Sequence, residues 1–397
     1  MSRQIAVLGA GLMGVATSIF LARGGAKVTL FEKSKAALGG ASRWNEGKLH
    51  LGYLYAADRS GKSIEAMQEA GLLFAPLVEE LSGVALQDHV SRQSDAYLVH
   101  RDSALPVGIV AAHMAKVDTL LQTREALSTY PGPIHPARAM DADRIDRLSG
   151  GHAVAGFEIA EYSVDTNWLA DRLLEAVANT ANLSVKLGRS VRRVSDLSGL
   201  MKGPWQIEIE GDKPRGRFDA VVNATWEGRL AIDQTLGLTP ERDWSYRYRK
   251  SIFVQTGAPI DVPGRTFITG PFGDIKNYDD RNFYVSWYPA GLIAEGNDIL
   301  PPSLPKVSDR RVLRDTLAGI SDIAPDVATL FSTAKEIKVE GGWIFAQGSG
   351  RLDDPAASIH RRDRYGTVRT GSYFSVDTGK YSTAPFLARK LATRITG

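Results

Sequence analysis

The sequence predicts an α/β fold in which a nucleotide-binding domain of Rossmann type is interleaved with an α+β domain built on a mostly antiparallel sheet. Three observations predict it. A strand, Ile5 to Leu8, runs into a glycine-rich turn and a helix-length segment. A second apolar strand follows and ends in an acid, Glu32. Farther along, residues 243–342 alternate apolar and polar side chains over strand lengths, with Gly, Pro, Asn and Asp between the strands.

The glycine-rich turn places Gly9, Gly11 and Gly14 at the spacing of a dinucleotide-binding unit. Gly9 permits the tight turn from strand to helix, Gly11 lets the backbone approach a pyrophosphate, and Gly14 lets the helix pack close to the strand. The phosphates would lie on free N–H groups at the helix N-terminus. Glu32 stands where a carboxylate accepts hydrogen bonds from both ribose hydroxyls, which disfavours NADP. This unit alone does not separate NAD from FAD.

A second motif follows Glu32, between Gly40 and Tyr55. It resembles the D-amino-acid oxidase superfamily of flavoproteins, and more narrowly the branch that oxidises L-2-hydroxyglutarate and glycerol-3-phosphate. Those proteins typically show G-A-S-S-R-N-S-G, a hydrophobic pair, H-x-G and nearby tyrosines. This chain keeps Gly40, Ala41, Ser42, Asn45, Gly47, His50, Gly52 and Tyr55, and it departs from the pattern at Arg43, Trp44 and Glu46. The resemblance implies FAD as the cofactor.

Later segments extend the resemblance over most of the chain. In the superfamily, the backbone at the position of Val191 meets the adenine, and residues 218–225 are similar to a V-V-N-A-A-G strand that returns to the phosphates. The last helix begins after residues 369–385 and would direct its N-terminus at the flavin pyrimidine edge. Beyond the three glycines and Glu32, the resemblance implies FAD contacts at Lys33, Ala41, Ser42, Asn45, Gly47, Val191, Ala224, Gly371, Gly379, Lys380, Tyr381 and Ser382.

The pieces of the expected FAD-binding domain lie at both ends and in the middle of the chain. We assign residues 1–82, 158–240 and 343–397 to the FAD-binding domain, and residues 83–157 and 241–342 to the substrate domain. Helices are expected at residues 63–81, 109–127 and 139–148, together with one that begins after Asp165 as its N-cap.

Three residues are candidates for catalysis. A neutral His50 imidazole suits a base that takes a hydroxyl proton while hydride leaves the substrate carbon, as the matching histidine does in hydroxy-acid oxidising relatives. Covalent attachment of the flavin and a purely structural role are the alternatives for His50. Lys380 would add positive charge where reduced flavin gains negative charge, unless it is a solvated lysine. Arg249 would bind a carboxylate or phosphate, unless it is a charged edge residue.

Strand alternation sends Tyr246 and Tyr248 to one face and Arg247 and Arg249 to the other. Glu46 could bind an amine or polarise His50, but a surface ion pair with Lys48 or Arg43 is the simpler interpretation.

We expect residues 274–278 to form a polar turn that could line a pocket. We expect residues 360–364 to form a basic loop that could hold a substrate anion or the FAD phosphates, although a solvated charge cluster is the simpler interpretation.

Composition excludes several classes of protein. The 397 residues are 43% hydrophobic and can bury a large core, with two domains expected. With 48 basic and 45 acidic residues the net charge is +3, too balanced to indicate nucleic-acid binding. No cysteine is present, so disulfides and a cysteinyl-flavin bond are excluded, and the histidine spacing predicts no metal site. No membrane span or signal peptide is expected, and a cytoplasmic location is the default.

Taken together, the sequence predicts an FAD-dependent oxidoreductase that removes hydride from a carbon bearing a hydroxyl group in an anionic hydroxy acid or polyol-like substrate. Oxidation of an amino acid or secondary amine is the alternative within enzymes of this kind. An NAD-dependent dehydrogenase and a catalytically silent flavin-binding protein are more distant alternatives. The electron acceptor is not identified by the sequence.

Overall fold

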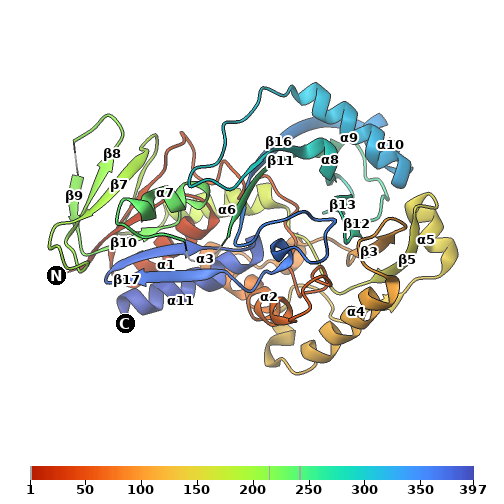
Figure 1. Cartoon of the computed structure of the whole chain (residues 1–397), viewed down its shortest axis with the longest axis horizontal. Coiled ribbons are helices and arrows are strands. Elements are labelled where there is room, and N and C mark those ends of the chain that lie inside the picture. Colours follow the sequence, from red (N-terminus) through yellow and green to blue (C-terminus); the bar gives the residue numbers. More distant parts are fainter. Residues whose placement is uncertain (1, 214, 241–242) are drawn as a thin grey trace.

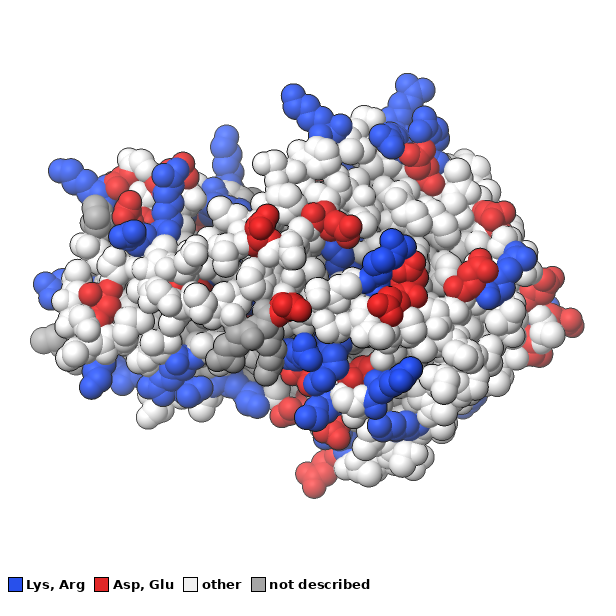
Figure 2. Space-filling view, viewed as in Figure 1, with Lys and Arg blue, Asp and Glu red and all other residues white. Residues whose placement is uncertain are grey.

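The computed structural model describes residues 2–213, 215–240 and 243–397. In Figure 1 the molecule is elongated, with both termini at one end, beside a parallel sheet, and a second, larger sheet toward the other end. The mixed α/β class predicted from the sequence is confirmed. Figure 2 shows basic and acidic side chains interspersed over the viewed face, as expected for a chain of net charge +3.

The first sheet has six strands in the order β17-β18-β10-β1-β2-β6, and its neighbours are parallel except for the β17–β18 hairpin. It draws strands from both ends and the middle of the chain, which is why the sequence motifs were so widely separated. The strands are β1 Gln4–Leu8, β2 Lys27–Phe31, β6 Leu183–Lys186, β10 Ala220–Asn223, β17 Gly366–Thr370 and β18 Tyr373–Asp377.

Helix α1 (Leu12–Arg23) is buried almost throughout because the sheet lies on one side and α11 (Ala384–Thr396) on the other. Helix α6 (Thr166–Ala178) begins as predicted, since the Asp165 carboxylate accepts the Asn167 N–H at 2.8 Å. The single helix expected at residues 63–81 is two helices that break at Leu73. The remaining elements of this part are α2 Lys62–Leu72, α3 Phe74–Ser82, α7 Arg229–Gln234 and the three-stranded sheet of β7 Val191–Asp196, β8 Trp205–Ile209 and β9 Arg215–Phe218.

The second sheet has nine strands, and its pairs are antiparallel apart from β3 with β12 in the described residues. We propose that the division into two domains follows the two sheets, with β16 carrying the second domain to Ala346. The strands are β3 Ala96–His100, β4 Arg138–Ala139, β5 Ala153–Glu158, β11 Ser245–Thr256, β12 Arg265–Ile268, β13 Gly273–Asn277, β14 Asn282–Trp287, β15 Leu292–Gly296 and β16 Ala334–Ala346.

Two features of this second part differ from the sequence prediction. Residues expected to be entirely β contain helix α9 (Asp309–Ile323), whose Val312, Thr316 and Ile320 are buried. The expected polar turn at residues 274–278 is instead largely strand β13. The other helices are α4 Val107–Leu121, α5 Ala142–Ser149, α8 Tyr288–Gly291 and α10 Val327–Ser332, with short 3₁₀ turns η1 Gln87–His89, η2 Glu125–Thr129, η3 Trp226–Gly228, η4 Ser358–His360 and η5 Tyr381–Thr383.

None of the helices within the described ranges combines the length and the apolar character that crossing a membrane requires.

Candidate active site

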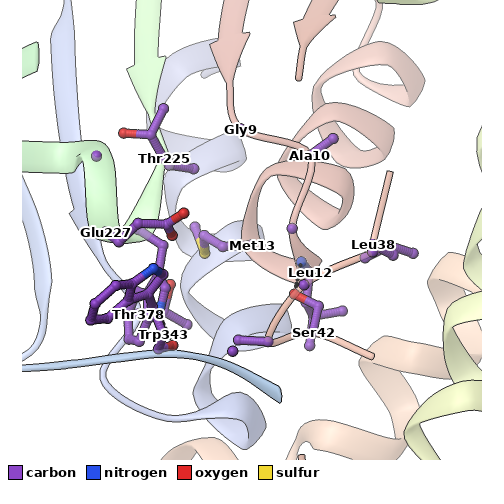
Figure 3. Close-up of a pocket in the computed structure, with 18 of the residues that line it drawn as sticks. Gly9, Ala10, Leu12, Met13, Leu38, Ser42, Thr225, Glu227, Trp343 and Thr378 are labelled. Carbon is purple, nitrogen blue, oxygen red and sulfur yellow. Dashed lines mark hydrogen bonds between the residues drawn. The ribbon is translucent and has the colours of Figure 1, made fainter. Parts of the chain in front are cut away.

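A cavity of about 780 Å³ opens at the carboxyl ends of β1, β2 and β10 and extends beneath β11 and β16. Figure 3 shows Gly9, Ala10, Leu12 and Ser42 on one side of this main cavity and Thr225, Glu227 and Trp343 on the other. The carboxyl edge of a parallel sheet is where folds of this type bind nucleotides, because strand ends and helix N-termini meet there.

The glycine turn has no room for side chains. Gly9 has a φ of +89°, and a Cβ atom on it would lie 2.6 Å from the carbonyl oxygen of Ala224. A Cβ on Gly14 would lie 1.9 Å from the carbonyl oxygen of Gly9, so α1 packs directly on the end of β1. The sequence therefore needs glycine at both positions for the backbone to take this path.

Polar side chains accept hydrogen bonds from backbone N–H groups around the N-terminus of α1. The Glu32 carboxylate accepts the N–H groups of Ala10 and Ser34, both at 2.8 Å. The Ser42 hydroxyl accepts the Leu12 N–H at 2.8 Å. Lys33 reaches Glu227 at 2.6 Å, and both side chains line the cavity. Hydrogen bonds therefore connect the glycine turn, Glu32 and the second motif at the N-terminus of α1.

Most of the residues expected at the cofactor site line the main cavity. Gly14 and Gly47 support its wall from behind; a Cβ on Gly47 would lie 1.9 Å from the carbonyl oxygen of Val164. Gly371 stands in the β17–β18 hairpin turn, and Ser382 is buried in η5. The expected residues that line the cavity are Gly9, Gly11, Glu32, Lys33, Ala41, Ser42, Asn45, Val191, Ala224, Gly379, Lys380 and Tyr381, together with His50 and Arg249.

A smaller cavity of about 190 Å³, here called the side chamber, adjoins the main one. Four charged side chains line both: Glu46, Lys48, Arg249 and Lys380. Asp274 and Arg362 line the side chamber, together with the aromatic residues Tyr55 and Tyr288. The place where the two cavities meet is therefore surrounded by charge of both signs.

Side chains alternate between the two faces of β11 at residues 246–249, as the sequence predicted. Arg249 donates to the Ser286 hydroxyl at 3.2 Å and lies 4.6 Å from the centre of the Tyr288 ring. Arg247, on the same face, donates to the Tyr288 hydroxyl at 3.2 Å. Tyr246 and Tyr248, on the opposite face, both pack against Trp343. The face of β11 that carries Arg249 therefore lines the side chamber.

Lys380 is a partly buried residue whose amine has no salt-bridge partner within 4 Å among the described residues. Burial, together with the nearby Arg362, Arg247 and Lys48 charges, lowers its pKa from 10.5 to about 7, although Glu46 acts in the opposite direction. An amine with this pKa exchanges a proton near neutral pH, which an ordinary lysine does not.

His50 is 1% exposed and lines the main cavity. Its Nδ1 atom lies 3.9 Å from Glu161 and has no hydrogen-bond partner among the described residues. Burial lowers the pKa of His50 well below 6.5, and Lys380 and Lys48 lower it further. The imidazole is therefore neutral at physiological pH.

Glu46 does not form the ion pair expected from the sequence. Lys48 pairs with Asp95 at 2.5 Å and Arg43 pairs with Asp171 at 2.7 Å, and no salt bridge joins the Glu46 carboxylate to a described residue within 4 Å. Burial raises the pKa of Glu46, but Lys380, Arg249 and Lys48 outweigh it and hold the pKa below 4.5. An ionised carboxylate therefore faces the junction of the two cavities.

The sequence prediction did not single out Lys48 as a residue of the site, and it offered a pocket role for Asp274 and an anion-binding role for Arg362 only as alternatives. Lys48 occupies a position where the resembling proteins have a hydrophobic residue, and that departure was the available signal. Arg362 was interpreted as part of a solvated loop, whereas its guanidinium faces the side chamber. Asp274 was assigned to a turn, although its strand turns it inward.

Comparison with known proteins identifies the family. The profile of the FAD dependent oxidoreductase family, abbreviated DAO, matches residues 4–371. The chain belongs to this family. No curated protein matches the sequence.

Solved structures agree with this assignment at the level of the fold. Glycine oxidase from Geobacillus kaustophilus is 16% identical, with a TM-score of 0.70 over 99% of this chain and 95% of that chain. Iminodiacetate oxidase from Chelativorans sp. BNC1 is 18% identical, with a TM-score of 0.66 over 98% and 94%. L-α-glycerophosphate oxidase from Mycoplasma pneumoniae, solved with FAD bound, is 13% identical, with a TM-score of 0.62 over 100% and 95%.

The main cavity of this DAO family member fits FAD. Its glycine turn lines the wall with backbone and no bulky side chain at Gly9 and Gly11, Glu32 and Val191 line one end, and His50 and Lys380 line the other. Bound FAD supplies the hydride acceptor, and the protein supplies orientation and electrostatics. The protein is an FAD-dependent oxidoreductase. The narrower branch suggested by the second motif stays a prediction, because amine and glycerophosphate oxidising proteins share this fold.

Proposed function

We propose that the protein oxidises a small amino acid or related amine that carries a carboxylate, with the side chamber as the substrate site. The observation that carries this proposal is the charge distribution of the chamber. It presents the guanidinium groups of Arg249 and Arg362 together with the carboxylates of Glu46 and Asp274. A zwitterion satisfies both signs of charge at once, whereas a neutral molecule would leave them facing each other across a desolvated space.

The arginine side supports recognition of a carboxylate. Burial lowers the pKa of Arg362 to about 10, and the neighbouring Arg247 contributes to that decrease. The guanidinium groups of Arg362 and Arg247 repel each other, so an anion bound beside Arg362 would relieve the repulsion. Arginine also presents a planar pair of donors that matches a carboxylate.

The acidic side supports an amine over a hydroxyl group. Glu46 is ionised under the influence of Lys380, Arg249 and Lys48, but no salt bridge within 4 Å joins it to a described residue, so an ammonium would give it a direct ion pair. The hydroxy-acid substrate expected from the sequence would use the same arginines but would leave Glu46 without a direct ion pair. This is the physical reason for preferring the amine alternative.

Lys380 is the proton acceptor that we propose. Oxidation of an amine by hydride transfer requires the nitrogen to lose its extra proton first, so that its lone pair can form the C=N bond. With a pKa of about 7, the Lys380 amine is substantially neutral under physiological conditions and faces both cavities. His50 is neutral as well, but its much lower pKa makes it the weaker base.

The test is an anaerobic panel of matched pairs, in which the amino and hydroxyl compounds share one carbon skeleton. Glycine is compared with glycolate, alanine with lactate in both configurations, and N-methylglycine and proline extend the amine series. Loss of the oxidised flavin absorption band reports reduction. We expect the amino compounds to react and the Arg249→Met variant to need much higher concentrations of them, with Arg249→Lys intermediate. Reduction by hydroxy acids alone would refute the amine assignment, and reduction by uncharged alcohols alone would refute the carboxylate site.

A further inference from the structure

A buried network of charges lies beyond the side chamber. The side chains of Lys48, Asp95 and Lys276 are between 2% and 4% exposed. Both lysines contact the same oxygen of Asp95, each at 2.5 Å. The hydroxyl of Thr266 also donates to this oxygen at 3.0 Å, and it accepts from Lys276 at 2.7 Å. Removing two ammonium groups from water costs several kcal/mol per ion before pairing compensates for it. In this network both ammonium groups share one oxygen of a single carboxylate.

The network connects the side chamber to a second opening. Asp274 lines the side chamber, and its Oδ2 lies 3.8 Å from the Nζ of Lys276. Lys276 and Asp95 line a small outer cavity of about 20 Å³. That volume is enough for roughly one water molecule. On its outer side the cavity is bordered by Arg92, whose side chain is 71% exposed and pairs with Asp280.

We propose that Asp274 and Lys276 form a relay that carries a proton from the side chamber to the outer cavity during turnover. This inference rests on the proposed function, because amine oxidation releases the proton that the relay carries. The substrate ammonium first gives up one N–H proton, and the C–H bond then breaks with its electron pair going to the flavin as hydride while the nitrogen lone pair forms the C=N bond of an iminium product. The N–H proton goes first to Lys380. A substrate that fills the small chamber excludes the water that would otherwise remove that proton.

The relay needs no other reactant than solvent water. Lys380 passes its proton to the Asp274 carboxylate, which lines the same chamber. Asp274 then donates to Lys276 as Lys276 releases a proton to water in the outer cavity, so each group ends in its starting state. Because the 3.8 Å separation is longer than a hydrogen bond, transfer requires Asp274 and Lys276 to approach each other during turnover.

The environment of the two groups supports exchange between them. Burial raises the pKa of Asp274, and Glu46 adds to this rise, although Lys276 and Lys48 oppose it. Burial lowers the pKa of Lys276, and Lys48 lowers it further against the pull of Asp95 and Asp274. An acid and an amine whose pKa values are moved toward each other pass a proton at less cost than an ordinary pair. Lys48 has its pKa raised, so it remains the fixed charge of the network.

Three variants of the FAD-loaded protein test the relay: Asp274→Asn, Lys276→Met and Lys276→Arg. Arginine keeps the positive charge beside Asp95 but does not release a proton in proteins, so it separates a relay from a structural ion pair. We expect all three to slow anaerobic flavin reduction by roughly tenfold or more and to increase the effect of replacing H₂O with D₂O. Lys276→Arg should be as slow as Lys276→Met.

Asp326→Asn is the matched control. It removes the partner of the buried Arg265 on the neighbouring strand β12 without touching either cavity. We expect it to lower the melting temperature and leave the flavin reduction rate unchanged. As a readout independent of activity, infrared spectroscopy should show the carbonyl stretch of a protonated carboxyl group that titrates above the usual range and disappears in Asp274→Asn.

The outcomes separate the two proposals. Rapid reduction of the parent protein by an amino compound, with the same rates and isotope effects in all relay variants, would overturn the relay and leave the proposed function standing. Full recovery of the rate by Lys276→Arg would also overturn it, in favour of a structural ion pair. If no amino compound reduces the parent protein, the proposed function fails and the relay fails with it. Should Lys276→Met not retain FAD, Asp274→Asn and Lys276→Arg decide the question.

Discussion

Replacing Lys380 with Met tests the proposed proton acceptor most directly. The Lys380 pKa of about 7 implies that roughly one tenth of the amine is neutral at pH 6 and roughly nine tenths at pH 8. If the neutral amine accepts the substrate proton, flavin reduction at saturating substrate should rise about tenfold across this range. In Lys380→Met the rise should disappear, and the rate at pH 8 should fall by roughly a hundredfold or more, the usual contribution of a general base.

The assay is anaerobic stopped-flow reduction of the FAD-loaded protein between pH 5.5 and 9.5, a range set at roughly two units either side of the Lys380 pKa. Flavin content and circular dichroism serve as controls for folding. A profile that keeps the same ionisation in Lys380→Met would refute the assignment. A larger loss of rate in His50→Ala than in Lys380→Met would move the base role to His50.

The same substitution has a consequence for stability, and its sign is opposite to that of most side-chain removals. The folded-state pKa of Lys380 lies below its ordinary value of 10.5, so the folded protein bears the cost of a partly buried ammonium at pH values below about 7. That cost is relieved as the pH rises from 7 toward 10.5, because the unfolded chain then binds more protons than the folded one. The decrease in the Lys380 pKa corresponds to at most roughly 5 kcal/mol in the free energy of unfolding, and screening by water in the cavity reduces this value. Apo Lys380→Met should therefore unfold at a higher temperature than the parent at pH 6, with the gap narrowing at higher pH.

Three further outcomes are expected. Gly14→Ala places a methyl group 1.9 Å from the Gly9 carbonyl oxygen, so it should lose FAD and destabilise the fold by about 1–3 kcal/mol; retention of flavin with an unchanged melting temperature would contradict this. His50→Ala should retain FAD, measured by its absorption, and reduce the flavin more slowly than the parent; unchanged reduction would remove His50 from the chemistry. Glu46→Gln should raise the KM for amino compounds several-fold without a matching effect on carboxylates that lack an amine, and an equal effect on both would contradict the proposed ammonium contact.

The sequence was sufficient for features that depend on neighbouring residues. The order of strand, glycine turn, helix and acid predicted the βαβ unit because glycine spacing and apolar runs are local properties of the chain. The cap at Asp165 and the alternation from Tyr246 to Arg249 were predictable for the same reason. Helix α9 had buried residues at four-residue spacing, but the surrounding β pattern concealed it.

The ion-pair partners of charged side chains could not be predicted from local sequence patterns. Lys48 pairs with Asp95 rather than with the nearby Glu46, because folding brings β3 beside the second motif. Because Lys48 pairs with Asp95, the Glu46 carboxylate has no salt-bridge partner among the described residues. Glu46 lies at the junction of the two cavities.

Strand β13 shows the same division between local signal and tertiary context. Its Asp274, Lys276 and Asn277 are residue types that strands disfavour, so the sequence predicted a turn. In the folded protein, Asp95 and Thr266 satisfy Lys276, and Ser286 donates to Asp274, so the polar strand is stable inside the sheet.

The sequence by itself therefore determined the family, the nucleotide-binding unit and the requirement for FAD. Only the tertiary structure decided which charges face one another in the side chamber, and with them the proposed substrate and proton route. The physical reason is that the strength and pKa of a buried charge depend on the distance and solvent exposure of groups far away in the chain.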